Sequence, residues 1–209
     1  MSVADYLLSR IYNEALETGK SIEEIAAPYQ MVTSSNLSSS RALRDVTEQY
    51  GGEYCTAAVG EVNVTTKMRE AGALIGGEGN GGVIYPALHY GRDAMVGVAL
   101  FLTNLAYKKM KVSELRASYP EYVIAKNKIE LSDSALIDRI LEEVKTVYAA
   151  EDINTIDGVK ISFEAKKEWV HLRRSNTEPI IRIYAEAATA EAADALAQQI
   201  IAIANKIIG

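Results

Sequence analysis

The chain has few cysteines and histidines and no long apolar run, and each shortage excludes a class of protein. Its 209 residues include one cysteine, Cys55, so an intrachain disulfide and a thiolate zinc cluster are both excluded. The two histidines, His89 and His171, lie too far apart in the sequence to indicate a local metal site. No apolar run reaches the ~20 residues that cross a bilayer, and the first residues do not have the pattern of a signal peptide. We therefore expect a cytoplasmic protein with no membrane partner.

Basic residues are in the minority, because 22 lysines and arginines face 28 aspartates and glutamates. The formal net charge of −6 argues against nucleic acid as a partner, although a local basic pocket stays possible. Hydrophobic residues make up 48% and charged residues 24%, which is typical of a globular protein and excludes a disordered segment. The length suits two small domains, each with its own core.

Helical and strand-like patterns alternate along the first half of the chain. Strands are predicted at 29–33, 53–59 and 73–75, and helices at 3–26 with a break at Gly19, at 43–50 and at 62–70. The serine-rich stretch 34–40 is expected to be a loop, because serine and asparagine favour turns and helix caps. This alternation favours an α/β domain with a largely parallel or mixed sheet, whose ligand-binding loops lie at strand ends.

Residues 93–108 have a helical pattern that is apolar on most sides. One stripe of this helix collects four apolar residues: Met95, Val98, Leu102 and Leu105. We expect a mostly buried helix whose methionine and Phe101 belong to the core.

The composition changes near Tyr119, where we place a boundary between a domain of residues 1–118 and a domain of residues 119–209. In the second part, strands are predicted at 122–131, 158–163, 168–172 and 180–187, and helices around 137–148 and from Thr189 onwards. This order predicts a small α+β domain in which an antiparallel sheet of about four strands carries two helices on one face.

Arginine and hydroxyl side chains gather in the connection between the last two predicted strands. The connection reads Arg173-Arg174-Ser175-Asn176-Thr177-Glu178-Pro179, and Arg182 follows three residues later. Guanidinium groups match the geometry of phosphate oxygens, and hydroxyls and backbone N–H groups in a turn can complete an anion site. The loop is therefore either a phosphate site or an ordinary solvated hairpin loop.

A second loop, Gly76-Gly77-Glu78-Gly79-Asn80-Gly81-Gly82, follows the strand at 73–75. Its glycines match the G-x-G-x-x-G pattern of dinucleotide sites, but a strand pattern follows where such a site needs a helix, so we reject that function. Glycines let the backbone approach a ligand closely, and Glu78 and Asn80 are the side chains of the loop that can hydrogen-bond it. The hydroxyls of a sugar would suit them; the alternative is a flexible hairpin whose Glu78 is solvated.

Together, these motifs resemble the C-terminal half of the α-D-phosphohexomutases. The motifs that carry the resemblance are Ser39-Ser40-Arg41-Ala42-Leu43, Lys67-Met68-Arg69, Gly76-Gly77-Glu78-x-x-Gly81 and Arg173-x-Ser175-Asn176-Thr177-Glu178-Pro179-x-x-Arg182. The resemblance covers almost the whole chain and is strongest to the phosphoglucosamine mutase and phosphomannomutase/phosphoglucomutase branches. It implies the fold of the third domain followed by that of the fourth, C-terminal domain.

The resemblance also implies a role for each loop. The glycine loop of the third domain would hold sugar hydroxyls through Glu78 and Asn80. The arginine loop of the fourth domain would hold the non-transferring phosphate through five residues: Arg173, Ser175, Asn176, Thr177 and Arg182. Because the fourth domain of the family rotates over the substrate cleft, the connection 119–128 would act as a hinge.

Four positions depart from the family pattern. The sugar loop of the family commonly reads Gly-Glu-x-Ser-Gly-His, whereas Asn80 stands here at the serine position and Gly82 at the histidine position. Ser38 stands where some members have a lysine, and Glu61 where some have a histidine. The contacts made by those residues in the family are therefore not carried over to this chain.

Two parts of the family's catalytic machinery do not occur in this sequence. In the family, a serine of the first domain exchanges the phosphoryl group, and an Asp-Gly-Asp-x-Asp-Arg loop of the second domain binds Mg²⁺. We therefore predict no catalytic and no metal-binding residue in this chain, which alone would be inactive because phosphoryl transfer depends on positioning and on a metal. By this resemblance, the complete enzyme would interconvert the 6-phosphate and the 1-phosphate of a hexose, with glucosamine as the expected sugar. Its cofactors would be Mg²⁺ and a hexose bisphosphate activator. Its partners would be the phosphosugar and the N-terminal domains.

Two other functions stay open. The chain could be a free-standing regulatory module that binds phosphosugars without catalysis. It could also be an interaction domain whose two loops bind no ligand.

Overall fold

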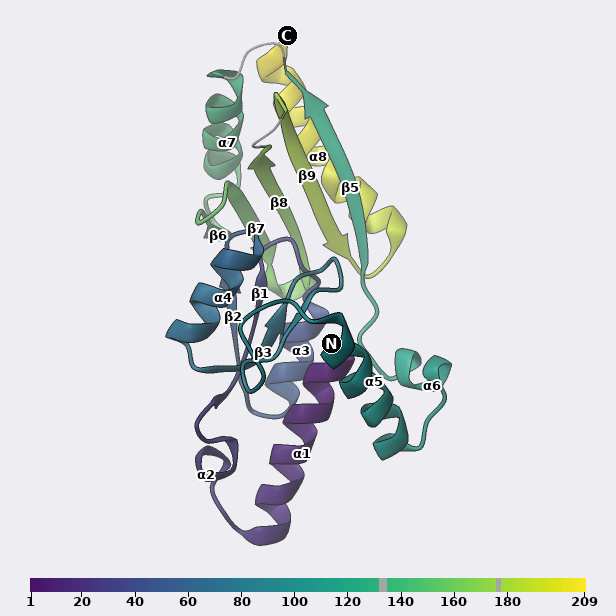
Figure 1. Cartoon of the computed structure of the whole chain (residues 1–209). Coiled ribbons are helices and arrows are strands. Elements are labelled where there is room, and N and C mark those ends of the chain that lie inside the picture. Colours follow the sequence, from purple (N-terminus) through teal and green to yellow (C-terminus); the bar gives the residue numbers. More distant parts are fainter. Residues whose placement is uncertain (132–134, 176–177) are drawn as a thin grey trace. The chain divides into compact units, whose positions relative to one another are not determined.

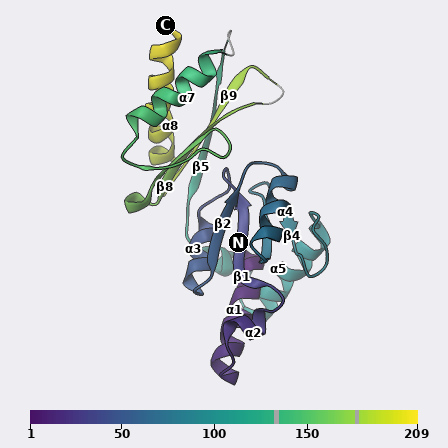
Figure 2. The ribbon, with the colours of Figure 1, turned by 90° about the vertical axis from the view of Figure 1, so that its left-hand side faces the viewer.

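The computed structural model describes residues 1–131, 135–175 and 178–209, and its internal contacts divide the chain into two compact units. The first unit is Met1–Glu121 and the second is Tyr122–Gly209 (Figure 1, Figure 2). Each unit contains its own sheet and its own buried core, so each is described by itself. Within the described residues, no helix is both long and apolar enough to cross a membrane.

The sheet of the first unit has the strand order β2-β1-β3-β4. β1 (Gln30–Asn36) lies between β2 (Glu53–Ala57) and β3 (Ala73–Gly77), and it runs parallel to both. β4 (Val83–Ile84) pairs with β3 in the antiparallel sense. The expected mixed sheet is confirmed, and the carboxyl ends of its parallel strands share one edge, where α/β folds bind their ligands.

Helices pack against both faces of this sheet. They are α1 (Ser2–Thr18), α2 (Ile22–Ala26), α3 (Ala42–Gln49), α4 (Glu61–Glu70) and α5 (Ala94–Lys108), whereas α6 (Val112–Ala117) packs with α3 and α5 through Leu115. Successive residues of β1 point to opposite faces, so Met31 packs with Leu8 of α1 while Val32 packs with Met68 of α4. The predicted break between the first two helices is confirmed at Gly19, which caps α1 with a left-handed φ of 70°.

The expected loop at 34–40 is only partly a loop, because β1 continues to Asn36. The polar side chains of residues 33–36 in β1 are buried in the sheet, and Thr33 and Ser35 hydrogen-bond to other protein side chains there instead of to water. Thr33 Oγ1 lies 2.6 Å from Thr47 Oγ1, and Ser35 Oγ lies 2.7 Å from the Tyr54 hydroxyl. The serine-rich composition misled the prediction, because pairing with two neighbouring strands outweighs the turn preference of serine.

The expectation that α5 is mostly buried is wrong. Met95, Val98 and Leu102 are 77%, 53% and 56% exposed, whereas Phe101 is half-buried on the inner side of the helix. The apolar pattern therefore indicated a helix correctly, but the outer face of that helix is uncovered in this structure.

A buried carboxylate ties several helices of the first unit together. Asp5 of α1 accepts hydrogen bonds from the Tyr50 hydroxyl at 2.8 Å, from Asn104 Nδ2 at 3.1 Å and from the Tyr119 hydroxyl and Lys108 Nζ at 2.5 Å each. Burial alone would raise the pKa of Asp5, but these hydrogen bonds outweigh burial and leave the pKa below its usual range. The cluster fixes α1 against α5 and against the segment that follows α6.

The second unit has an antiparallel sheet of strand order β5-β9-β8-β7-β6. The strands are β5 (Val123–Glu130), β6 (Asp152–Asn154), β7 (Val159–Phe163), β8 (Glu168–Arg174) and β9 (Ile180–Ala187), and the short 3-10 helix η1 (Glu164–Lys166) joins β7 to β8. The expected strands correspond to β5, β7, β8 and β9, and the short edge strand β6 was not predicted. Three residues give too little alternation to mark a strand in the sequence.

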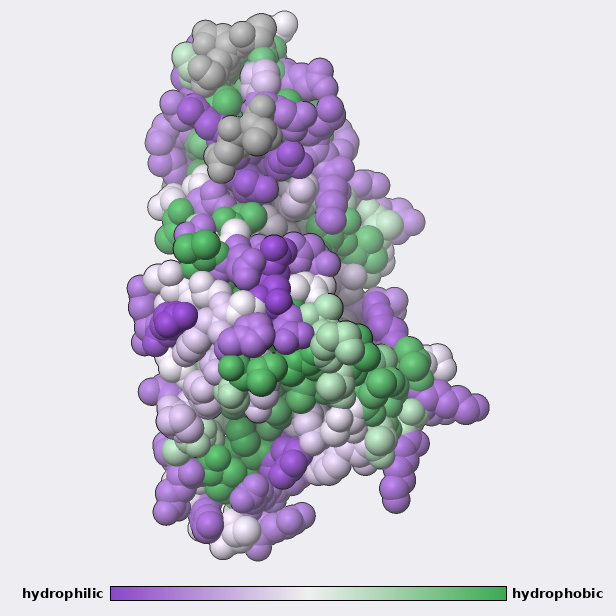
Figure 3. All heavy atoms as spheres, viewed as in Figure 1, coloured by the Kyte–Doolittle hydropathy of each residue, from purple (hydrophilic) through white to green (hydrophobic). Residues whose placement is uncertain are grey.

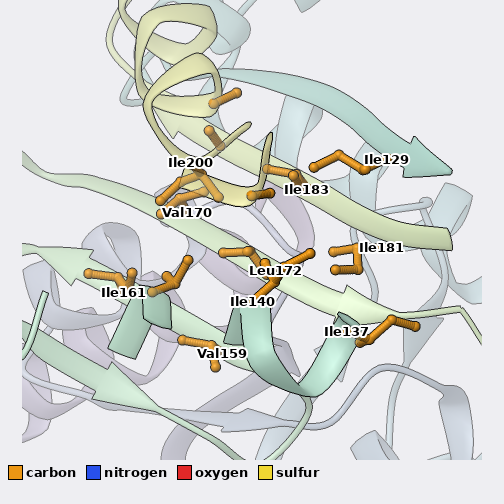
Figure 4. Close-up of a cluster of buried hydrophobic side chains, with 14 of the residues drawn as sticks. Ile129, Ile137, Ile140, Val159, Ile161, Val170, Leu172, Ile181, Ile183 and Ile200 are labelled. Carbon is orange, nitrogen blue, oxygen red and sulfur yellow. The ribbon is translucent and has the colours of Figure 1, made fainter. Parts of the chain in front are cut away.

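One face of this sheet forms the main core of the second unit. Helices α7 (Ala135–Val147) and α8 (Ala190–Ile208) pack against that face, as predicted (Figure 4). Ile140 of α7 and Ile200 of α8 belong to the same buried cluster as Val170 and Ile183 of the sheet. Because side chains alternate along a strand, the residues between these apolar ones point to the other face.

Candidate functional site

In the first unit, β3 runs directly into the glycine loop, which folds into a tight turn. The Glu78 N–H donates to the Gly82 carbonyl at 3.0 Å, and the Gly81 N–H donates to the Glu78 carbonyl at 3.0 Å. A Cβ atom on Gly77 would lie 2.0 Å from the Gly82 carbonyl oxygen, so only glycine fits at position 77. The turn therefore presents Glu78 and Asn80 at the carboxyl edge of the parallel strands.

Glu78 is held by the end of β1 and is not a solvated side chain. Its Oε1 accepts a hydrogen bond from Asn36 Nδ2 at 2.9 Å, and the side chain is 6% exposed. Asn36 Oδ1 accepts in turn from Ser39 Oγ at 2.9 Å, and Ser39 Oγ accepts from the Gly79 N–H at 2.9 Å. Sequence reasoning had counted the polar stretch of Asn36 and Ser39 as a loop, so it missed this support for Glu78.

A cation that the sequence reasoning did not identify stands beside Glu78. Arg92 NH1 lies 3.7 Å from Glu78 Oε2, and Arg92 is clamped by Glu61 of α4. Glu61 Oε2 accepts from Arg92 Nε at 2.7 Å, and Glu61 Oε1 accepts from the Arg92 backbone N–H at 3.1 Å. These hydrogen bonds hold the pKa of the Glu61 carboxyl below its usual range, so the carboxylate and the guanidinium form a charged pair.

A pocket of about 470 Å³ opens between the glycine loop and the start of α5. It is lined by Glu61, Asn80, Gly81, Gly82, Val83, Arg92, Asp93 and Ala94. A Cβ atom on Gly82 would lie 2.6 Å from Arg92 Cδ, so the stem of the arginine occupies the space that a side chain at position 82 would need. Three of the positions that depart from the family pattern, 61, 80 and 82, thus line one pocket together with Arg92. Asn80 is exposed, and its Oδ1 accepts from the Gly82 N–H at 3.0 Å, so its Nδ2 is the part of the amide that can donate to a ligand.

In the second unit, the strand register lines up cations on the face opposite the core. Arg173 of β8 pairs directly with Arg182 of β9, and Arg182 pairs with Lys128 of β5. Directly paired residues point to the same face, so the three side chains form a row across adjacent strands. Lys128 was not among the predicted phosphate ligands, because its place in this row depends on the register of β5 against β9.

The members of this row differ in their partners. Arg182 NH2 forms an ion pair with Glu178 at 3.2 Å, and Lys128 Nζ forms one with Glu130 at 2.7 Å. Arg173 Nε is buried and has no hydrogen-bond partner among the residues that the structure describes. A buried donor without a partner is costly, so this Nε is suited to an acceptor that residues 1–131, 135–175 and 178–209 do not supply.

The remaining predicted phosphate ligands are placed only in part. Ser175 is buried at the end of β8, and its N–H donates to the Ile180 carbonyl at 3.0 Å, which closes the base of the arginine loop. Asn176 and Thr177 lie outside the described residues. Arg174 pairs with Ile181 and therefore points to the core side of the sheet, where its NH2 lies 3.4 Å from Asp138 of α7.

On the face of the sheet opposite the core, buried polar groups of β8 and β9 lie next to the row of Lys128, Arg182 and Arg173. Trp169 Nε1 donates to Glu186 Oε1 at 2.6 Å, and His171 Nε2 lies 2.6 Å from the Asp157 carbonyl. Burial lowers the pKa of His171 to about 4, and the neighbouring Lys160 and Arg173 also disfavour the imidazolium. The histidine is therefore neutral near pH 7.

Among residues 1–131, 135–175 and 178–209, no three His, Cys, Asp or Glu side chains gather closely enough to hold a metal ion.

Comparison with protein families assigns each of the two units to a domain of one family, the family that the sequence motifs resemble. Residues 5–122 match the family described as phosphoglucomutase/phosphomannomutase, alpha/beta/alpha domain III. Residues 126–203 match the phosphoglucomutase/phosphomannomutase C-terminal domain.

Several curated proteins are similar to the chain over part of their length. The phosphoglucosamine/phosphogalactosamine mutase of Sulfurisphaera tokodaii is 35% identical over 166 residues, which are 78% of this chain and 36% of that protein. The phosphoglucomutase/phosphomannomutase of Thermococcus kodakarensis is 35% identical over 159 residues, which are 75% of this chain and 34% of that protein. The chain therefore spans little more than a third of the relatives it matches.

Solved structures share the fold. The open form of the Paramecium phosphoglucomutase parafusin aligns with a TM-score of 0.71 and 19% identity, over 100% of this chain and 42% of that one. The N-acetylphosphoglucosamine mutase of Aspergillus fumigatus, solved with GlcNAc-6P and magnesium, aligns with a TM-score of 0.68 and 15% identity, over 100% of this chain and 44% of that one. Since the two family matches account for residues 5–122 and 126–203, the chain belongs to the phosphoglucomutase/phosphomannomutase family and carries its domain III and its C-terminal domain.

Proposed function

We propose that this chain is the substrate-binding C-terminal half of a phosphohexomutase, in which residues 1–118 recognise the sugar and residues 119–209 bind its phosphate. The complete enzyme would interconvert a hexose 6-phosphate and the corresponding 1-phosphate through a bisphosphate. The name of the S. tokodaii relative, phosphoglucosamine/phosphogalactosamine mutase, supports an amino sugar as the hexose.

The observation that carries the proposal is the row formed by Lys128, Arg182 and Arg173. Like charges directly opposite each other in a sheet are destabilising, by up to ~1 kcal/mol for a pair. A phosphate that bridges Arg173 and Arg182 would relieve this repulsion and give the buried Arg173 Nε an acceptor. Ser175, Asn176 and Thr177 would complete the phosphate site from the loop itself.

The glycine-loop pocket would take the sugar ring. Asn80, which lines the pocket, would offer its Nδ2 as a donor to sugar hydroxyls, and Glu78 Oε2, which lies 3.7 Å from NH1 of the pocket-lining Arg92, would offer an acceptor. Arg92 adds further donors on the same side of the pocket, and Glu61 fixes its position. A ring of hydroxyl and amino substituents matches this mixture of acceptors and donors.

Binding by this half alone should be weak. Each hydrogen bond from a charged group contributes about 1.5–3 kcal/mol, so two arginines contribute about 3–6 kcal/mol. The upper end corresponds to a dissociation constant of tens of micromolar, and the lower end to more than a millimolar. We also expect no mutase activity from the chain alone, because the phosphate-exchanging serine and the Mg²⁺ ligands would be supplied by the N-terminal domains of the enzyme.

An NMR titration tests the binding role. The chain is titrated with glucosamine 6-phosphate, glucose 6-phosphate and inorganic phosphate, in the wild type, in Arg173→Met and in the matched control Arg139→Met, whose arginine is exposed on α7. We expect all three ligands to shift amides around Ser175 in the wild type and the control, and the sugar phosphates to shift amides around Glu78 as well. Equal shifts in Arg173→Met would refute the phosphate site.

A chimera tests the enzymatic role. The part of the S. tokodaii mutase that precedes the matching segment is fused to the start of this chain, and the product is assayed for conversion of glucosamine 6-phosphate with Mg²⁺ and a hexose bisphosphate. Activity that requires both parts supports the proposal. A folded chimera that binds the phosphosugar without converting it would favour a non-catalytic binding module.

A further inference from the structure

The outer face of α5 has a composition that is unusual for an exposed helix. Lys108, at the C-terminal end, is the single charged residue of Ala94–Lys108. Its ammonium group points to the buried Asp5 on the inner side. The most exposed large side chains of α5 are therefore Met95, Val98 and Leu102, and the space-filling view shows this region of the first unit as hydrophobic surface (Figure 3).

A helix that is apolar on all sides is normally buried on all sides, whereas a surface helix carries a polar outer stripe. Contiguous exposed apolar patches in soluble proteins usually mark interaction sites. Met95, Val98 and Leu102 follow the spacing i, i+3 and i+7, so they form one continuous stripe along the helix. The inner side of α5 is already packed, through Leu100, Phe101 and the buried Asn104, and cannot turn the stripe inward.

The relatives indicate what covers this stripe. The chain spans 36% of the S. tokodaii mutase, and its two units match domain III and the C-terminal domain of the family. The rest of such a polypeptide, which precedes domain III, is therefore available to pack against the first unit. We propose that the α5 stripe, defined as Met95, Val98 and Leu102, is the docking surface for the preceding domains of the mutase polypeptide. This inference rests on the proposed function for the identity of the partner.

Thiol labelling tests the docking surface. In a Cys55→Ser background, Leu102→Cys is compared with the matched control Leu16→Cys, whose leucine is 69% exposed on α1. Labelling by a maleimide is followed in the chain alone, over a range of protein concentrations, and in the chimera with the preceding part of the S. tokodaii mutase. We expect both cysteines to react at similar rates in the chain alone. In the chimera, Leu102→Cys should react at least ten times more slowly while Leu16→Cys is unchanged.

Three results would overturn the inference. The first is a chimera that binds phosphosugar while its Leu102→Cys thiol reacts as fast as in the chain alone; this result would show that the preceding domains do not cover the stripe. Slow labelling of the chain alone that depends on concentration assigns the stripe to a second copy. Slow labelling without concentration dependence assigns it to the second unit of the same chain. Because labelling needs no substrate, a chimera that protects Leu102→Cys but has no mutase activity supports the docking surface and counts against the proposed function.

Discussion

Replacing Arg173 by methionine should separate the stability of the second unit from its affinity for phosphate. Methionine keeps an unbranched apolar stem in place of the arginine stem but removes the guanidinium. The change removes the positive charge directly opposite Arg182. It also removes a buried Nε that has no hydrogen-bond partner among the residues that the structure describes. The free protein should therefore not be weakened, although a conspicuous arginine has been removed.

The magnitudes follow from the strand register. Relief of a directly opposed like-charge pair is worth ~0.2–1 kcal/mol, so the free energy of unfolding of the second unit should stay equal or rise by that amount. Loss of one charge-assisted hydrogen bond to phosphate costs about 1.5–3 kcal/mol, which weakens binding by about 10- to 150-fold. With a dissociation constant of about 1 mM, 100 mM phosphate would stabilise the wild type by ~2.7 kcal/mol and the variant by half of that or less.

The single tryptophan makes this measurement specific for the second unit. Trp169 is buried on β8, so its fluorescence during urea unfolding reports on this unit and not on the first. Unfolding is measured with and without phosphate at constant ionic strength. Arg139→Met on α7 corrects for the general stabilising effect of phosphate on proteins.

Two results would refute the reasoning. A clear loss of stability in Arg173→Met without phosphate would show that the guanidinium has a stabilising partner within the protein. Equal stabilisation of the wild type and Arg173→Met by phosphate would show that the row of Lys128, Arg182 and Arg173 does not bind the anion.

Three further predictions concern pH, the buried carboxylate and the glycine loop. His171 has a pKa of about 4 in the folded protein, below the ~6.5 of an unfolded histidine. As the pH falls, protons therefore bind the unfolded state first, and the free energy of unfolding of the second unit should fall by up to ~3 kcal/mol between about pH 6.5 and pH 4. A flat profile of Trp169 fluorescence unfolding over this range would contradict the assignment. Asp5→Asn should destabilise the first unit by ~3 kcal/mol, because Lys108 loses its buried charged partner. Tyr50→Phe removes one hydrogen bond to the same carboxylate and should cost only ~1 kcal/mol. Hydrogen exchange of α1 amides measures both losses, and equal losses would argue against a central role for the carboxylate. Gly82→Ala should displace the Arg92 side chain and weaken the NMR shifts that a sugar phosphate causes near Glu78, while the response of the second unit to inorganic phosphate stays unchanged. Unchanged shifts near Glu78 would show that the position of Arg92 does not matter for sugar binding.

The second unit shows how far a sequence predicts a site on a sheet. The loop from Arg173 to Pro179 could be proposed as a phosphate site from the sequence, because its arginines and hydroxyls are concentrated in consecutive residues. Lys128 was not, although it stands in the same row as Arg173 and Arg182. Its position depends on which residue of β5 faces which residue of β9, and that register is set by the packing of the whole core face.

The first unit shows the same limit for helices and loops. Periodicity predicted α5 as a helix, but an apolar pattern does not say whether the covering surface belongs to the same unit. Arg92 was not predicted as a neighbour of Glu78, because it follows the glycine loop by ten residues and its position depends on Glu61 of α4. In contrast, Glu78 could be proposed from the sequence because it is the acidic side chain within the glycine loop itself.

The packing of Arg92 across Gly82 has a consequence for how this pocket can change over evolutionary time. A side chain at position 82 and the present path of the arginine are mutually exclusive, since a Cβ atom there would lie 2.6 Å from Arg92 Cδ. Glu61 is useful only while the arginine follows that path. The three positions are therefore coupled in evolution: a side chain acquired at 82 would push Arg92 off its present path, and Glu61 would then lose the partner that it now holds. A substitution at any one of these positions therefore changes which residues are acceptable at the other two.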